Sequence, residues 1–258
     1  MRRFLDQSPD RERRRQIRLM SLLERQFQRR FAKEFQAETI RVLTFYKITG
    51  EFSSLLFDHL EALTKIEADL VEISMRVFGD RILNQGKAAG LILDAKLNTT
   101  TFYRDKAIEY LRQESVRQRI SSISKTTRER IISALTMAIR DGKSIDTAID
   151  EILKASALIS KTRAKIIART ELHGAANAGA NEAAKEAALD LKKEWISAND
   201  DRTRPGHRKA NGQVVEQDQK FKVTNENGVD EFLLYPGDPN ASVGMVVNCR
   251  CTLGHVLA

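Results

Sequence analysis

The stretch Trp195-Ile196-Ser197-Ala198-Asn199-Asp200-Asp201-Arg202-Thr203-Arg204-Pro205-Gly206-His207 divides this 258-residue sequence into two parts of different character. Upstream, residues 10–204 contain no proline, so long helices are permitted there and nothing kinks them. Downstream, short β-prone runs at 213–215, 220–223, 231–234 and 244–247 alternate with turn residues. We therefore predict a mainly α protein with long helices in the N-terminal two-thirds. A small C-terminal α+β module should follow, with short antiparallel strands after residue 196.

Apolar residues recur at helical spacing along the proline-free part. Met20, Leu23, Phe27, Phe31 and Phe35 share one face of a helix expected from about Arg11 to Tyr46. Further helices are expected at about 56–78, 102–119, 125–140, 145–153 and 160–193. Glycines at 79, 86 and 90 leave open whether the second helix continues through them or breaks. A helix stop at Gly142 with a restart at Ser144 suggests a helical region 1–141 and a second domain 142–258.

Composition narrows the class of protein. With 41% hydrophobic and 30% charged residues, the sequence suits a folded helical protein rather than a disordered chain. No window approaches the roughly 18 apolar residues of a membrane span, and no apolar signal core follows Arg2 and Arg3. We therefore expect a protein that is made and kept in a cytoplasm and has no membrane partner. The two cysteines are too few for a disulfide framework.

The net charge of +8 is concentrated near the N-terminus, where residues 1–33 hold 11 basic and 4 acidic side chains. Such a basic amphipathic helix suits docking onto an acidic protein surface or DNA. The alternative is an ordinary charged helix packed within its own domain. The candidate contact residues are the arginines of this arm: Arg11, Arg13, Arg14, Arg15, Arg18, Arg25, Arg29 and Arg30.

Cys249 and Cys251 flank Arg250 near the C-terminus. If this segment is a strand, both sulfurs point to one side about 6.5 Å apart, which is too far for a disulfide. Both thiolates could instead bind one zinc ion, with His207 as the third ligand and His255 or Asp200 as the fourth. The alternative is a pair of small buried residues, because free cysteine is among the most buried residue types.

The second half, from about Gly142 to Thr252, resembles the phage Mu protein F-like, or head morphogenesis, family. The resemblance rests on an ordered series of motifs: Ile167-Ala168-Arg169-Thr170-Glu171, Lys193-Glu194-Trp195-Ile196-Ser197, Asp200-Asp201-Arg202-Thr203-Arg204 with His207, Asn211-Gly212, a strand around Phe221, Tyr235-Pro236-Gly237-Asp238-Pro239 and Asn248-Cys249-Arg250-Cys251. One departure is Met245 after Gly244, where the family often has an acidic residue. The resemblance marks Arg169, Glu171, Trp195, Asp200, Asp201, Arg202, Arg204, Asn248 and Arg250 as structural motif residues.

This resemblance implies a non-enzymatic minor capsid protein of a tailed phage, made in the host cytoplasm and incorporated near the portal vertex of the assembling head. Its expected partners are the portal protein and other capsid or scaffolding proteins, with packaged DNA as a further neighbour. Two alternatives remain open. One is a metal-dependent hydrolase or nuclease that uses Asp200, His207, Cys249 and Cys251; the other is a general DNA-binding protein whose affinity resides in residues 1–33.

Overall fold

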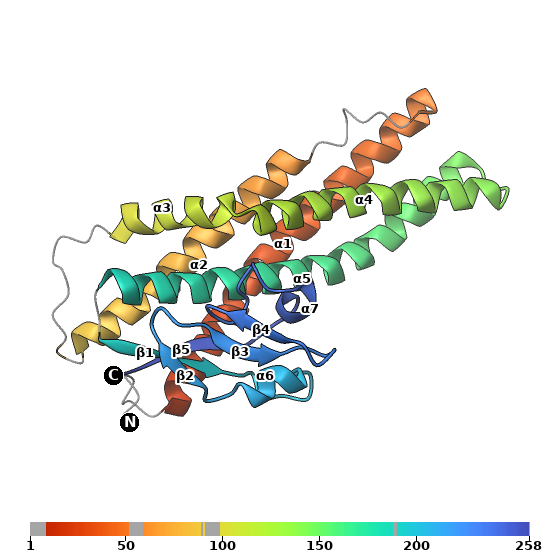
Figure 1. Cartoon of the computed structure of the whole chain (residues 1–258). Coiled ribbons are helices and arrows are strands. Elements are labelled where there is room, and N and C mark those ends of the chain that lie inside the picture. The colour runs from red at the N-terminus through yellow and green to blue at the C-terminus, as the bar shows by residue number, and fades with distance from the viewer. Residues whose placement is uncertain (1–8, 52–58, 89, 91–98, 188–189, 258) are drawn as a thin grey trace.

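Long helices dominate the architecture of the chain. The computed structural model describes residues 9–51, 59–88, 90, 99–187 and 190–257. An elongated bundle is formed by α1 (Pro9–Thr49), α2 (Leu60–Ala88), α3 (Thr99–Arg112), α4 (Glu114–Arg140) and α5 (Ile145–Glu186). The C-terminal module packs against the side of this bundle, beside the N-terminal part of α1 (Figure 1). The predicted fold class is therefore confirmed.

The C-terminal module consists of two small antiparallel sheets and two short helices. In the first sheet, β1 (Leu191–Ile196) lies between β2 (Val214–Glu216) and β5 (Thr252–Leu257). The second sheet pairs β3 (Phe221–Thr224) with β4 (Asp230–Leu233). The short helices are α6 (Pro205–Lys209) and α7 (Val243–Val246). This arrangement brings the end of the chain back beside the strand that follows α5.

The apolar stripe predicted on the first helix is buried as expected. Met20, Leu23, Phe27, Phe31 and Phe35 are each at most 9% exposed. Their burial removes large apolar side chains from water, which is the main favourable term in folding. Among the described residues, no helix combines the length and apolar character needed to cross a bilayer.

Several helix boundaries differ from those predicted. The second helix continues through Gly79 and Gly86, while Leu56, where it was expected to begin, lies outside the described residues. The segments 102–119 and 125–140 are instead divided at Gln113, which is extended (φ −60°, ψ 132°) and precedes the continuous helix α4. Ser144 caps α5 as predicted by accepting a hydrogen bond from the Thr147 amide.

The expected break before Ser160 was wrong, because α5 runs unbroken for 42 residues. No glycine or proline lies between Gly142 and Gly174, so no residue there interrupts helical hydrogen bonding. The same helix ends at Glu186 rather than near Lys193, and β1 begins at Leu191. This strand was missed because its pairing with β2 and β5 comes from distant parts of the sequence.

The strands after residue 196 were predicted with mixed success. The runs near 214, 221 and 231 form β2, β3 and β4, and Gly212 and Gly228 occupy turns with φ of 78° that favour glycine. The run 244–247 was predicted as a strand but falls in helix α7 and the turn after it. Cys249 and Cys251 likewise precede β5 rather than lying in a strand.

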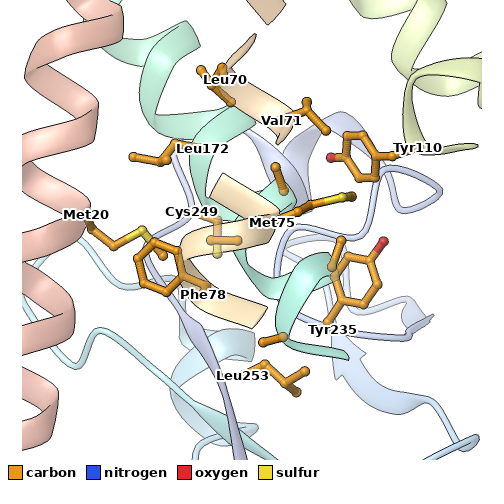
Figure 2. Packing of buried hydrophobic residues seen from close by; sticks show 14 of the residues in the cluster. Met20, Leu70, Val71, Met75, Phe78, Tyr110, Leu172, Tyr235, Cys249 and Leu253 are labelled. Carbon is orange, nitrogen blue, oxygen red and sulfur yellow. The ribbon is translucent and has the colours of Figure 1, made fainter. Parts of the chain in front are cut away.

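One hydrophobic core joins the bundle to the C-terminal module. Met20 of α1, Phe78 of α2 and Leu172 of α5 belong to the same buried cluster as Cys249 and Leu253 (Figure 2). The core therefore crosses the boundary expected between residues 141 and 142, and that division stays a prediction. A second, smaller cluster lies farther along the bundle and joins α1, α4 and α5: Val42, Leu43, Ile131, Leu135, Ala138 and Ala148.

Candidate functional site

Arg169 connects three segments where the bundle meets the C-terminal module. Its guanidinium donates two hydrogen bonds to the Glu24 carboxylate of α1, at 3.0 and 2.7 Å. A third goes to the side-chain oxygen of Asn248, at 2.9 Å. Asn248 has a positive φ of 60°, and its amide donates to the Thr170 hydroxyl. This arrangement fixes the start of the cysteine segment relative to α5 and α1.

Glu171 does not pair with Arg169, because residues two positions apart on a helix do not face each other. Arg119 of α4 donates two hydrogen bonds to the Glu171 carboxylate, at 3.0 and 2.8 Å. The nearby Glu67 of α2 is buried, and burial together with the charge of Glu171 holds its pKa well above the usual value. The raised pKa favours the protonated form of Glu67, which lessens its repulsion with the Glu171 carboxylate beside Arg119.

The loop after β1 is organised by Asp200. Its Oδ1 accepts hydrogen bonds from the Arg202 amide, the Thr203 hydroxyl and the Arg250 guanidinium, at 3.1, 2.9 and 2.9 Å. Partial burial raises the pKa of Asp200, but these hydrogen bonds and the charge of Arg250 outweigh burial and hold that pKa below its usual value. Asp200 therefore fixes the conformation of this loop and forms an ion pair with Arg250.

The remaining motif residues of this loop divide between buried and exposed positions. Trp195 is fully buried, and its ring meets those of His207 and Phe221 edge to face. Arg204 donates to the Val247 carbonyl at 2.7 Å, which ties the loop to the end of α7. Asp201 and Arg202 have exposed side chains.

His207, Cys249 and Cys251 come together inside the module. The ligand atoms of these three buried side chains lie within 4.8 Å of one another. His207 Nδ1 is 3.5 Å from the Cys249 sulfur and 3.4 Å from the Cys251 sulfur. Without a metal, the hydrogen bond between the two thiols lowers the pKa of Cys249 and raises that of Cys251.

The two residues predicted as a fourth ligand lie outside this group of described side chains. Asp200 is engaged by Arg250, and His255 lies within β5, paired with Lys193 of β1. His255 is buried, and burial lowers its pKa to about 3. The structure therefore brings together three of the five predicted ligand residues.

Two buried polar residues of this region were given no role from the sequence, although Lys193 stands within one of the quoted motifs. Asn177 of α5 donates to the Pro236 and Cys251 carbonyls and accepts from the Leu253 amide, at 2.7, 3.1 and 2.9 Å. Lys193 donates to the Leu234 carbonyl, and burial lowers its pKa to about 8. Helical periodicity could not find Asn177, because its partners are backbone groups brought close only by tertiary folding.

A cavity of about 200 Å³ lies at the junction of α1, α5 and the loop after β1. Its lining includes the polar residues Gln16, Glu24, Arg169, His173, Asp200 and Arg250. Burial lowers the pKa of His173 to about 4, so this histidine is neutral at pH 7. His207, Cys249 and Cys251 do not line this cavity.

The arginines predicted as contact residues of the N-terminal helix fall into three groups. Among the described side chains, five are exposed and form no ion pair within the described part of the chain: Arg14, Arg15, Arg18, Arg25 and Arg29. Arg30 is half-buried and pairs with Asp69 of α2 at 2.5 Å. The side chains of Arg11 and Arg13 lie outside the described part of the structure.

Four of the exposed arginines form one stripe. Arg14, Arg18, Arg25 and Arg29 are spaced by four, seven and four residues, which places them on a single helix face. Leu22 lies within that stripe and is 52% exposed. The stripe faces away from the buried side of α1 that carries Phe27. We call these five residues the α1 basic stripe.

Comparison with known proteins identifies the region that contains these motifs. The model of the family described as phage Mu protein F like protein matches residues 129–254. Minor head protein GP7 of Bacillus phage SPP1 is 32% identical over 143 residues, covering 55% of this chain and 43% of that protein. Uncharacterized protein YqbB of Bacillus subtilis (strain 168) is 30% identical over 143 residues, covering 54% of this chain and 46% of that protein.

The chain thus spans less than half the length of these two curated relatives. No solved structure gives a significant match. The matched region begins within α4, includes all of α5 and ends within β5, so it contains the Arg169, Asp200 and Cys249 contacts described above. Residues 129–254 of the chain therefore match the phage Mu protein F-like family.

Proposed function

We propose that this protein is a minor head protein that takes part in head assembly of a tailed phage and docks onto the portal protein through the α1 basic stripe. The family and the similarity to a minor head protein of phage SPP1 support the assembly role. The observation that carries the docking proposal is the stripe, whose four arginines lack partners among the described residues. Unpartnered cations on one rigid helix suit an acidic protein surface.

The apolar members of the surface favour a protein partner over DNA. Leu22 lies within the stripe, and Ile17 beside it is 55% exposed. Protein interfaces bury apolar anchors inside a polar rim, whereas nonspecific DNA binding depends on phosphate contacts by basic side chains. Packaged DNA is therefore the second candidate partner. A substitution of Leu22 distinguishes the portal protein from DNA.

A non-enzymatic role fits the position of the His207, Cys249 and Cys251 group. All three side chains are at most 3% exposed, and the junction cavity is lined by other residues. A hydrolase needs its metal or nucleophile at a surface that the substrate reaches. We therefore assign these residues a structural role.

The docking proposal is tested by co-purification with the portal protein of the same phage. Simultaneous substitution Arg18→Glu, Arg25→Glu and Arg29→Glu should abolish capture, because each exposed cation becomes an anion facing an acidic partner. The matched control is Arg140→Glu, Lys154→Glu and Lys165→Glu, which changes the net charge equally at exposed positions outside the stripe. Loss of capture by both variants, or by neither, would contradict the proposal.

Leu22→Ser then distinguishes protein from DNA. Replacing an apolar anchor should weaken portal binding about tenfold or more, since burying a leucine contributes roughly 1.5–3 kcal/mol. DNA affinity should stay unchanged, because this substitution removes no charge. If Leu22→Ser leaves portal capture intact while the arginine variant flattens the salt dependence of DNA binding, DNA is the partner instead.

A further inference from the structure

The group formed by His207, Cys249 and Cys251 is assembled from two segments that are distant in sequence. His207 lies in α6, and the cysteines lie in the loop between α7 and β5. α6 is held tightly against β3, because a Cβ at Gly206 would overlap the Thr224 carbonyl oxygen. Trp195 contacts the His207 ring edge to face at 5.4 Å. The imidazole is therefore fixed in place before any ligand binds.

The distances agree with tetrahedral zinc coordination. Zinc binds cysteine sulfur at about 2.3 Å and histidine nitrogen at about 2.0–2.1 Å, so a tetrahedral angle separates the sulfur from the nitrogen by about 3.5 Å. His207 Nδ1 lies 3.5 and 3.4 Å from the two sulfurs. The distance from His207 Nδ1 to each sulfur therefore matches the distance expected between two ligand atoms of one zinc ion.

Simple hydrogen bonding accounts for only part of this geometry. The unprotonated Nδ1 of a neutral imidazole has one lone pair, which suits one thiol donor, whereas here two sulfurs converge on it. The Cys251 amide also donates to the Cys249 sulfur at 3.5 Å. Backbone donors of this kind orient and stabilise thiolate ligands in metal sites.

Charge balance favours a divalent ion in this interior. Two thiolates, a neutral imidazole and one zinc ion sum to zero, so the buried group carries no net charge that would oppose folding. Soft sulfur ligands select zinc over magnesium or calcium, which prefer oxygen. Among the described residues, no fourth histidine, cysteine or carboxylate joins the group.

We propose that His207 Nδ1, Cys249 Sγ and Cys251 Sγ bind one zinc ion that clamps α6 to the segment before β5, with a water molecule completing the tetrahedron. The clamp would secure the loop from Ser197 to Arg204 against the end of the chain. It goes beyond the docking role, because it needs neither the portal protein nor the α1 basic stripe.

Metal analysis of the full-length protein, purified under reducing conditions after growth with zinc, tests this proposal. We expect one zinc ion per chain, released when a mercurial reagent has titrated two thiols. Cys249→Ser and Cys251→Ser should each abolish stoichiometric binding. The matched control His255→Leu changes another buried histidine outside the group and should retain zinc. Stoichiometric zinc in both cysteine variants would overturn the assignment.

Cobalt substitution keeps the test decisive if the serine variants do not fold. Tetrahedral Co²⁺ bound to the wild-type protein should give intense visible bands and thiolate-to-cobalt charge-transfer absorption, both lost when zinc is added. A chelator should lower the unfolding temperature of the zinc-loaded protein. Absence of these bands, together with substoichiometric zinc, would show that the two cysteines are only small buried side chains.

Discussion

At the scale of single residues, burial of polar groups decides the chemistry of the C-terminal module. His255 has both ring nitrogens buried without a hydrogen-bond partner among the described residues. Burial lowers its pKa from about 6.5 to about 3, and the charges of Arg81 and Lys193 act in the same direction. The folded protein therefore keeps this imidazole neutral where the unfolded chain protonates it.

This difference predicts a loss of stability in acid. Between pH 6.5 and 3 the unfolded state binds the proton and the folded state does not, so the free energy of unfolding falls as the pH falls through this window. One such group removes about 2 kcal/mol between pH 7 and pH 5. His255→Leu should remove that part of the decline, measured by urea unfolding at both pH values. An equal decline in the variant would contradict the expected pKa of His255.

At the scale of secondary-structure elements, α5 organises the bundle through close backbone contacts. Gly179 lies directly against the backbone of Met75 in α2, and a Cβ there would come within 2.6 Å of the Met75 carbonyl oxygen. The alanine-rich second half of α5 is buried for the same reason, since small side chains let helices approach closely.

Gly179→Ala should therefore destabilise the protein although alanine favours helix formation. Overlap with the α2 backbone forces the helices apart and should cost about 1–3 kcal/mol of unfolding free energy. Gly244→Ala in α7 is the matched control, since its Cβ would meet only the Ser242 hydroxyl at 3.9 Å. Denaturant unfolding measures both variants, and equal stabilities would refute the close contact.

At the scale of the whole molecule, the bundle and the C-terminal module depend on one another. Arg169 joins α5 to Glu24 of α1, and Arg119 of α4 holds Glu171. The apolar core also continues from α1 and α2 into the module (Figure 2). The basic stripe and the family motifs thus belong to one packed structure.

A fragment of residues 142–258 should accordingly fail to fold cooperatively. Without α1 and α2, the alanine-rich face of α5 would be exposed to water, and Glu171 and Arg169 would lose their partners. Fluorescence of Trp195 during urea unfolding should show a broad transition in the fragment and a sharp one in the full chain. A sharp transition in the fragment would establish residues 142–258 as an independent domain.

The amino-acid sequence by itself determined the features that depend on neighbours a few residues apart. Periodic apolar residues specified the buried face of α1, Ser144 specified a helix start, and Gly212 and Gly228 specified turns between short strands. These signals are local because helical and turn hydrogen bonds close over a few residues. Ordered motifs likewise indicated the family whose model matches residues 129–254.

Only the tertiary structure decided features whose partners are far apart in the chain. β1 exists because β2 and β5 pair with it, and the buried Lys193 finds its acceptor on Leu234. The cysteines were expected to align along a strand, yet a loop turns both sulfurs toward His207, more than 40 residues away. Long-range contacts leave no periodic signal in the sequence, because they form only when separate elements pack around a common core.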